Sequence, residues 1–220
     1  MQYKKRARSK AAKLERKDAI LAAAETLLRQ SAYDVMTMQA VAMEAGLGKG
    51  TLYLYFSSRE GLILDVYGRL FDKWIERFAS HVTTVTSVQE FCQNFGHFYT
   101  DDPLFIKLSG FAISLADPQI DRGSYIRGNR ATASRVKKLA GIACQRLRMT
   151  PGLAQRFIWG LLTVASGATQ MSMRPPPSNE GFPDDVTSFI GSTNFETVFL
   201  NAAVPLSVGI LQADTRMKVQ

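Results

Sequence analysis

The sequence predicts an all-α protein, and three observations support this fold class. Apolar residues recur three and four positions apart over most of the chain, as they do along one face of a helix. Capping boxes at 57–60, 87–90 and 193–196, and Asp-Pro or Thr-Pro pairs at 102–103, 117–118 and 150–151, have the composition of helix N-termini. The sequence contains no convincing alternating strand and no Asn-Gly hairpin turn. We therefore expect about nine helices.

Positive charge is concentrated at the N-terminal end of the chain. The net charge is +8, and residues 1–60 hold eleven Lys and Arg against six Asp and Glu, whereas residues 61–220 hold sixteen against thirteen. Such an excess in the first quarter is typical of a segment that faces nucleic acid. Cys92 and Cys144 form neither a CxxC pair nor a metal-ligand cluster, so we expect reduced thiols, no metal and no cofactor. With no secretory signal and no long uninterrupted apolar span, we expect a cytoplasmic protein that binds no membrane.

The first helix is predicted from Ile20, Ala24, Leu27 and Leu28, which recur at helical spacing and end near residues 31–34. Eight Lys and Arg against one Glu occupy residues 4–17, ahead of that apolar face. This basic segment has two interpretations: a solvated tail, or a basic arm that neutralises phosphates or enters a minor groove. Its position just before a helix favours the arm.

Two short helices with a glycine-containing turn are predicted next. Thr37 is a good N-cap for the first of them, and Gly46 suits the left-handed residue that ends it. The following helix is expected over 49–56, because Leu52 and Phe56 form an apolar pair four residues apart. Two short helices joined by such a turn make a helix-turn-helix, here at about residues 37–56.

The glycines at 46–50 also suggest nucleotide binding, but their spacing argues against it. A phosphate loop requires GxxxxGK followed by Ser or Thr, whereas Gly48-Lys49 is followed by Gly50 and Met43 occupies the first glycine position. A Rossmann fingerprint requires GxGxxG after a strand, whereas Thr51 occupies the third glycine position here and the preceding segment is helical. A nucleotide-binding enzyme that uses this stretch is therefore a disfavoured alternative.

Residues from about 14 to 62 resemble the DNA-binding domain of the TetR family of bacterial transcriptional regulators. The matching features occur in the family's order: Ile20…Ala23-Ala24…Leu27, Tyr33…Thr37, Val41-Ala42…Ala45-Gly46-Leu47, Lys49-Gly50-Thr51-Leu52-Tyr53, Tyr55-Phe56 and Ser58-Arg59-Glu60. The resemblance implies a three-helix N-terminal unit and a larger helical C-terminal domain that binds a ligand and dimerises. We therefore expect a DNA-binding domain at 1–60, with its basic arm, and an effector-binding and dimerisation domain at 61–220.

The resemblance also implies which residues contact DNA. The third helix would enter the major groove by its N-terminus, where short residues let the backbone approach, while tyrosine hydroxyls bind phosphates. Gln39 would be able to read a base edge. Ser57 is expected to cap the fourth helix beside Arg59, which makes that helix N-terminus a phosphate site. The implied contacts are Thr37, Gln39, Gly48, Lys49, Gly50, Thr51, Tyr53, Tyr55 and Arg59.

Several residues in this segment leave questions open. Gly48 replaces the serine usual at the cap of the recognition helix, which costs roughly a few tenths of a kcal/mol and removes one phosphate ligand. Ala32 replaces a common glycine in the first turn. Leu54 occupies a variable position, so the bases that are read stay open. The alternative role of Tyr53 and Tyr55 is to pack the small domain.

The C-terminal part is predicted to hold an effector site. It is expected to include a loop at about 174–192 with one helical turn near 186–190, and a last helix at about 194–212 that Pro205 kinks or interrupts. Its aromatic residues outnumber what a minimal core needs, so most would pack the core and some would line a cavity for an apolar or aromatic effector. Eight basic residues at 118–149 indicate a solvated face, or else an anionic ligand. The candidate effector contacts are Trp74, Phe78, Phe95, His97, Tyr99, Phe111 and Trp159, with Asn94, Gln170 and Arg130 as further polar candidates.

The last two long helices have the composition of a dimer interface. In the family they pair with those of a second subunit as a four-helix bundle, and small and apolar residues at 151–172 and 194–212 suit that role. An intramolecular core would use the same residues; the resemblance favours the dimer. The predicted interface residues are Phe157, Gly160, Leu161, Val164, Gly167, Phe195, Phe199 and Leu206.

These features predict a dimeric, ligand-responsive transcriptional regulator. We expect a repressor that binds a near-palindromic operator and is released by a small-molecule effector. We expect no enzyme, because His81 and His97 lack metal-ligand spacing and the SxxK match at 134–137 lacks its partner motifs. The other alternative is a helical ligand-binding protein without DNA function. The sequence names neither the operator nor the effector.

Overall fold

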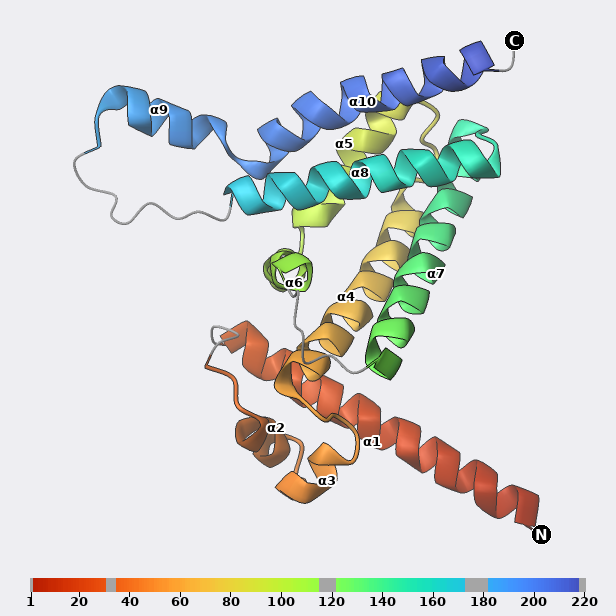
Figure 1. The fold of residues 1–220 in the computed structure, drawn as a ribbon, viewed down its shortest axis with the longest axis vertical. Coiled ribbons are helices and arrows are strands. Elements are labelled where there is room, and N and C mark those ends of the chain that lie inside the picture. The colour runs from red at the N-terminus through yellow and green to blue at the C-terminus, as the bar shows by residue number, and fades with distance from the viewer. Residues whose placement is uncertain (1, 31–34, 115–121, 173–181, 218–220) are drawn as a thin grey trace. The chain divides into compact units, whose positions relative to one another are not determined.

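The protein is all-α, as predicted. The computed structural model describes residues 2–30, 35–114, 122–172 and 182–217, and every regular element in these ranges is a helix. The chain forms two compact units, Met1–Arg69 and Leu70–Gln220, and the long helix α4 belongs in part to each (Figure 1). The helices are α1 Gln2–Gln30, α2 Met38–Glu44, α3 Lys49–Tyr53, α4 Arg59–His81, α5 Val88–Thr100, α6 Pro103–Ser114, α7 Arg122–Leu147, α8 Pro151–Ser172, α9 Asp184–Ser192 and α10 Phe195–Met217.

The described residues contain ten helices rather than about nine, and α9 is longer than the single turn predicted at 186–190. Asp184 and Asp185 lie in its first turn, where acidic side chains complement the positive end of the helix dipole. The predicted Asp-Pro start at 117–118, Ala32 and the proline run at 175–177 lie outside the described residues.

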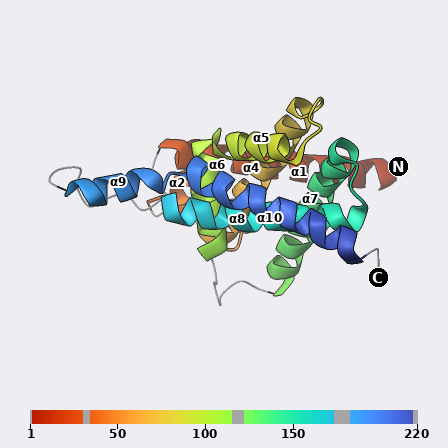
Figure 2. The same cartoon turned by 90° about the horizontal axis from the view of Figure 1, so that it is seen from above.

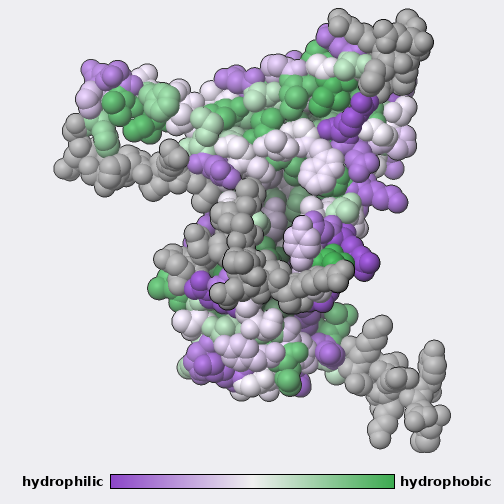
Figure 3. All heavy atoms as spheres, viewed as in Figure 1, coloured by the Kyte–Doolittle hydropathy of each residue, from purple (hydrophilic) through white to green (hydrophobic). Residues whose placement is uncertain are grey.

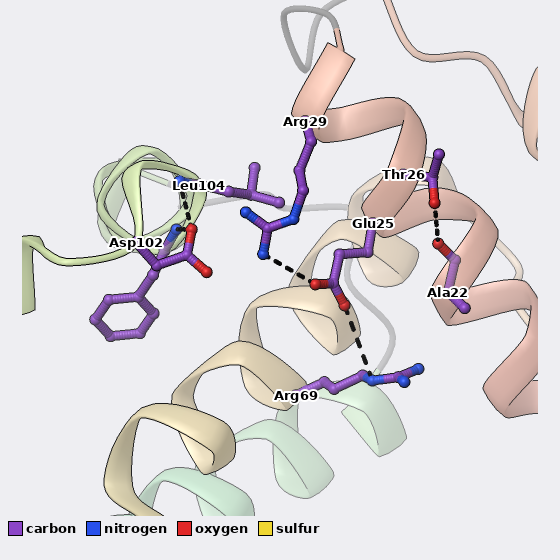
Figure 4. Close-up of polar contacts among 8 residues, drawn as sticks. Ala22, Glu25, Thr26, Arg29, Arg69, Asp102 and Leu104 are labelled. Atoms are coloured by element: carbon purple, nitrogen blue, oxygen red, sulfur yellow. Dashed lines mark hydrogen bonds and ion pairs between the residues drawn. The ribbon is translucent and has the colours of Figure 1, made fainter. Parts of the chain in front are cut away.

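The N-terminal unit is held together by a small apolar core and by ion pairs between α1 and α4. The apolar residues Ile20, Ala24, Leu52, Leu62 and Val66 are buried. The polar links run from Lys17 Nζ to Asp65 Oδ2 at 2.7 Å, and from Arg69 Nη1 to the Asp18 carbonyl at 3.2 Å. Figure 4 shows the Glu25 carboxylate between Arg29 on its own helix, at 2.9 Å, and Arg69 of α4, at 3.9 Å. The backbone of the basic segment 4–17 is helical and continuous with α1.

The turn between α2 and α3 has the geometry predicted from its glycine. Thr37 caps α2, since its Oγ1 accepts a hydrogen bond from the Ala40 amide at 3.1 Å. At the other end Gly46 has φ +64°, its amide donates to the Met43 carbonyl, and the Leu47 amide donates to the Ala42 carbonyl at 2.8 Å. These two bonds form a Schellman motif, which ends a helix through a left-handed residue.

Replacing Gly46 with alanine is expected to lower the free energy of unfolding by about 1–2 kcal/mol, because L-residues are disfavoured at this φ. A Cβ at Gly46 would meet nothing within 4 Å, so the cost is one of backbone conformation alone. Urea unfolding measures it. Gly48→Ser is the matched control: Gly48 has φ −70° and open space, so the serine is expected to stabilise α3 slightly by capping it. Equal stability of the two variants would contradict this account of the turn.

Two predicted helix caps are shifted by one residue. Helix α4 begins at Arg59, so Ser58 and not Ser57 is the cap: the Gly61 amide donates to Ser58 Oγ at 3.1 Å. Likewise the Thr197 amide donates to Asn194 Oδ1 at 2.9 Å. The cap is therefore Asn194, because Thr193 ends α9 and its hydroxyl donates to the Ile190 carbonyl. The predicted caps Ser87 and Asp102 are confirmed, as they accept from the backbone amides of Glu90 and Leu104.

The C-terminal unit is built around two long helices, α8 and α10. They are antiparallel and run alongside each other in both views (Figures 1 and 2). Helix α7 packs on α8, and α5 packs on α10. Phe91, Phe95, Phe157 and Phe199 are fully buried where these helices meet. The close approach requires Gly96, because a Cβ there would lie 2.8 Å from the Phe199 ring.

Helix α10 is not interrupted at Pro205, contrary to one of the two outcomes predicted for it. It is one helix from Phe195 to Met217 with Pro205 inside it. The ring of Pro205 is exposed, so the lost backbone hydrogen bond is on the outer side of the helix. The stretch Phe195–Ala213 is long and apolar enough to cross a membrane by length and composition alone, a property shared with helices that pack inside soluble proteins.

Candidate DNA-binding surface and C-terminal aromatic core

Helix α3 presents an unusually open first turn. It starts at Lys49 and ends at Tyr53, earlier than the predicted residue 56. Leu52 is fully buried and anchors the helix, whereas Gly48, Lys49 and Gly50 are exposed. A Cβ at either glycine would meet nothing within 4 Å. Because these positions carry no side chains, another molecule can approach the backbone of this turn closely.

Polar groups that suit phosphate and base contacts lie on the same small unit. The side chains of Thr37 and Gln39 are exposed at the start of α2. Since Thr37 Oγ1 accepts from the Ala40 amide, the bond leaves its hydroxyl hydrogen to be donated outward. Tyr53 is 45% exposed, and Thr51 and Tyr55 are half-buried.

Arg59 lies at the N-terminus of α4, as predicted, and it is paired there with a neighbouring glutamate. Its side chain is half-buried at the start of α4, and Nε donates to Glu60 Oε1 at 3.0 Å. The neighbouring carboxylate offsets part of the positive charge of Arg59. The attraction of this helix N-terminus for an anion is therefore weaker than it would be without that carboxylate. The N-cap position of α4 is occupied by Ser58, whose hydroxyl accepts a hydrogen bond from the Gly61 amide.

The structure adds Leu54, a residue that the sequence pattern left open. This leucine follows α3 and is 80% exposed, the largest exposed fraction among the large apolar side chains of the described residues. It lies four residues after Gly50, and therefore on the same face of the α3 turn. An apolar side chain at this place suits contact with a thymine methyl group. Only exposure identifies it, because a leucine at helical spacing is equally consistent with a core position.

The structure brings together four of the seven residues predicted to contact an effector. Trp74, Phe78, Phe95 and Tyr99 are buried, and Trp74 lies with its ring centroid 5.3 Å from Phe78, 5.0 Å from Phe95 and 6.2 Å from Tyr99.

The other three are not brought into this cluster by the described contacts. His97 is exposed and its ring lies against Phe98 of its own helix. Trp159 is 47% exposed on α8. The side chain of Phe111 lies outside the described side chains. Of the further polar candidates, Gln170 and Arg130 are exposed, and the Asn94 amide donates to the Glu90 carbonyl.

Among the described residues, the aromatic core includes three buried hydroxyl groups and one buried indole. Tyr99 of α5 forms side-chain hydrogen bonds with Ser109 of α6 and Thr169 of α8. Burial raises the pKa of the Tyr99 hydroxyl, and these two bonds lower it by less, so the phenol stays protonated well above neutral pH. The indole Nε1 of Trp74 is buried and has no hydrogen-bond partner among the described residues.

Half of the eight residues predicted for the dimer interface are buried within one copy of the chain. Phe157, Leu161, Phe195 and Phe199 are buried, so they contribute to the intramolecular core. Gly160 is the contact point of α8 with α10, since a Cβ there would lie 3.2 Å from side-chain atoms of Leu206 and Ile210. Val164 is half-buried, whereas Gly167 is exposed and Leu206 is 41% exposed.

The fold and the open α3 turn define a helix-turn-helix DNA-binding domain. The family model described as "Bacterial regulatory proteins, tetR family" matches residues 20–66, which lie almost wholly in this unit. This N-terminal segment is therefore similar to the DNA-binding domain of the TetR family. It is 33% identical over 63 residues to the "Uncharacterized HTH-type transcriptional regulator YuxN" of Bacillus subtilis, a match of 29% of this chain and 22% of the relative. The chain thus aligns with about a fifth of that relative's length.

The fold of nearly the whole chain also matches solved regulators. A putative TetR-family transcriptional regulator from Mesorhizobium loti superposes with a TM-score of 0.54 at 16% identity, covering 88% of this chain and 96% of that one. The transcriptional regulator FadR from Bacillus subtilis, in complex with stearoyl-CoA, superposes with a TM-score of 0.52 at 15% identity, covering 86% and 96%. At these identities the likeness concerns the fold.

Proposed function

We propose that the protein is a ligand-responsive transcriptional regulator that binds a near-palindromic operator as a dimer and releases it when a small-molecule effector binds. The observation that carries this proposal is the open first turn of α3, where Lys49 stands between two exposed glycines in a TetR-family domain. In the proposed complex this turn enters the major groove, while Thr37, Tyr53 and Tyr55 bind phosphates and Gln39 and Leu54 contact bases.

The proposed dimer interface lies on the outer face of α8 and α10. Trp159, Met171, Leu206 and Val208 are apolar residues of these helices that are 41–51% exposed in a single copy. Exposed Gly167 adds a position for close approach. Figure 3 shows hydrophobic side chains gathered along α10. Exposed apolar surfaces commonly mark interfaces, and a dimer that binds two half-sites one DNA turn apart needs its two α3 helices about 34–36 Å apart.

The proposed effector site lies in the C-terminal unit, among the aromatic residues around Trp74. Helix α4 connects this site to the DNA-binding unit in one continuous element. Its N-terminal part carries Asp65 and Arg69, which bind α1, and its C-terminal part carries Trp74 and Phe78. A ligand that shifts α4 would therefore change the spacing of the two recognition helices, which is a two-state coupling between ligand and DNA. The stearoyl-CoA complex of the FadR neighbour supports a ligand-binding role for this fold.

A gel-shift experiment with the DNA that flanks the protein's own gene tests the proposed function. We expect a complex that survives an excess of non-specific competitor DNA. The logarithm of its affinity is expected to fall linearly with the logarithm of the salt concentration. Absence of a competitor-resistant complex would overturn the proposal. Tight ligand binding without such a complex would instead indicate a helical ligand-binding protein, and ATP turnover that depends on Lys49 would indicate an enzyme.

A further inference from the structure

The first half of α1 extends beyond the apolar core of the N-terminal unit. The helix begins at Gln2, no side chain from residue 11 to residue 19 is buried, and the core begins at Ile20. Figure 1 shows this half of α1 running past α2 and α3. A helical segment of this length without a core is only marginally stable in water, so a partner that binds along it would stabilise it.

Basic residues form a stripe along this extension, in line with the face of α1 that packs the core. Going back from Ile20 in steps of three, four, three and four residues, which keeps to one face of a helix, every position is basic. Glu15 and Asp18 lie off this face. The same helix face therefore changes from basic to apolar where the core begins. We call these four residues the basic stripe: Arg6, Lys10, Lys13 and Lys17.

The contacts of Lys17 show where the basic stripe meets the rest of the unit. Its Nζ lies 2.7 Å from Asp65 Oδ2 of α4 and 5.4 Å from the centroid of the Phe56 ring. Phe56 is joined to the end of α3, because its amide donates to the Leu52 carbonyl at 3.0 Å. Helix α3 has five residues and is therefore only about 7–8 Å long. The basic stripe thus starts close to α3 and continues away from it along α1.

The helical backbone of the extension separates the two kinds of DNA contact that its sequence suggests. A helix with its side chains is about 10–12 Å across, whereas the minor groove of B-DNA is about 6 Å wide. The extension therefore cannot enter a minor groove in the way an extended arm would. Phosphates on the outside of the duplex suit it better, because the helix rises about 10 Å from Arg6 to Lys13, which is the length of about three base pairs.

We propose that the basic stripe is a second DNA-contact surface, which binds backbone phosphates as a helix beside the half-site that α3 enters. Lys17 positions the stripe through its contacts with Asp65 and Phe56, and the three residues before it bind the phosphates. This inference rests on the proposed function, because it extends the DNA-binding surface of the proposed regulator. Since phosphates carry no sequence information, the stripe adds affinity for any duplex and no selectivity for the operator.

Two triple variants of the full chain, which lose the same amount of charge, test the proposal. Glutamine is the replacement in both, because it forms helices about as well as lysine and arginine do. The stripe variant changes three residues of the basic stripe: Arg6→Gln, Lys10→Gln and Lys13→Gln. The matched control changes three basic residues of the same segment that lie off that face: Lys4→Gln, Lys5→Gln and Arg8→Gln. Circular dichroism checks that both variants keep their helix content.

The measurement is the affinity for a random-sequence duplex, by fluorescence anisotropy at several salt concentrations. Each phosphate contact contributes about 0.9 to the slope of log affinity against log salt, so the stripe variant is expected to lose about 2.7 for each bound subunit. The control variant is expected to lose less than about 0.9, because its charges do not face the duplex. Equal slopes for the two variants would overturn the proposal, since the segment would then act only through its net charge.

A proline substitution tests whether the basic stripe acts as a helix. Ala12 is exposed, lies off the stripe and precedes the core, so Ala12→Pro changes no charge and leaves the packed part of α1 intact. Proline inside a helix kinks or breaks it, which would turn Arg6 and Lys10 away from the line of the stripe. The slope is therefore expected to fall by about 1.8 for each bound subunit. Ala12→Gln is the control and should keep the wild-type slope. An unchanged slope in Ala12→Pro would indicate a flexible arm and overturn the proposal.

The basic stripe and the proposed function are judged separately, because the random duplex requires no operator. A competitor-resistant operator complex whose salt slope is the same in the stripe variant and the control refutes only the stripe. A slope that depends on the stripe, in a protein without such an operator complex, refutes only the regulator. Vesicles of phosphatidylglycerol test the other anionic surface. If the stripe variant loses binding to these vesicles but keeps the wild-type slope on the duplex, the stripe binds membranes and the proposal is overturned.

Discussion

Replacing Leu206 with arginine is expected to convert the proposed dimer to a monomer and to weaken operator binding by about 100-fold or more. Leu206 lies on the proposed α8–α10 interface and is 41% exposed in one copy. In a two-fold interface the substitution occurs twice, and each arginine would be buried without a counter-ion. The monomer then loses the avidity gained when two linked domains bind two half-sites, which reaches 10²–10⁴-fold.

Sedimentation equilibrium and gel shift measure the two effects on the same preparations. Tyr125→Arg is the matched control, because Tyr125 is an aromatic side chain on α7 that is 63% exposed and lies off the proposed interface. It is expected to leave both the dimer and the operator complex unchanged. Leu206 also lies beside Gly160, so circular dichroism should confirm that the arginine variant is folded. Trp159→Arg provides an independent second substitution among the exposed apolar residues of the proposed interface. Dimers in both arginine variants would contradict the assigned interface.

Replacing Lys49 with alanine is expected to weaken the operator complex about tenfold and to lower its salt dependence. Lys49 is exposed at the first position of α3, where its ammonium group can neutralise a phosphate. Each phosphate contact contributes about 0.9 to the slope of log affinity against log salt, so a dimer that loses two contacts should lose about 1.8. Gel shifts at four or five salt concentrations give both quantities.

The control for charge is Lys137→Ala, which removes an exposed lysine from α7 and should leave the slope unchanged. Tyr53→Phe separates contact from packing in the same surface. Tyr53 is 45% exposed, so loss of its hydroxyl is expected to weaken the complex while the free energy of unfolding stays within about 0.5 kcal/mol. A variant that is destabilised but binds the operator normally would show that Tyr53 packs the small domain instead.

Local sequence signals predicted the N-terminal elements well, because short-range chemistry decides them. Thr37 caps α2 and Gly46 takes the left-handed conformation, as their residue types indicate. The same signals placed two caps one residue early, at Ser57 and Thr193. A capping box predicts the helix start only to within a residue or so when the next residue can also cap. Ser58 and Asn194 follow the predicted caps directly, and they accept the hydrogen bonds from the Gly61 and Thr197 amides.

Periodicity alone could not tell which apolar residues of α8 and α10 serve the core and which are left for a partner. Phe157 and Phe199 lie on the face turned toward the other helices of the same chain, whereas Leu206 stays partly exposed. Both sets have helical spacing, because a helix that packs on two sides is apolar around most of its circumference. Burial, which depends on every neighbouring helix, separates them.

By itself the sequence determined the all-α class, the helix-turn-helix and the residues at its turn, since each depends on residues within a few positions of one another. Only the tertiary structure decided that Leu54 is exposed, that Arg59 is paired with Glu60, and that the Trp74 indole is buried without a partner. The physical reason is that exposure and hydrogen-bond satisfaction depend on which helices surround a side chain. Residues far apart in the chain, such as Trp74 and Phe105, supply those surroundings.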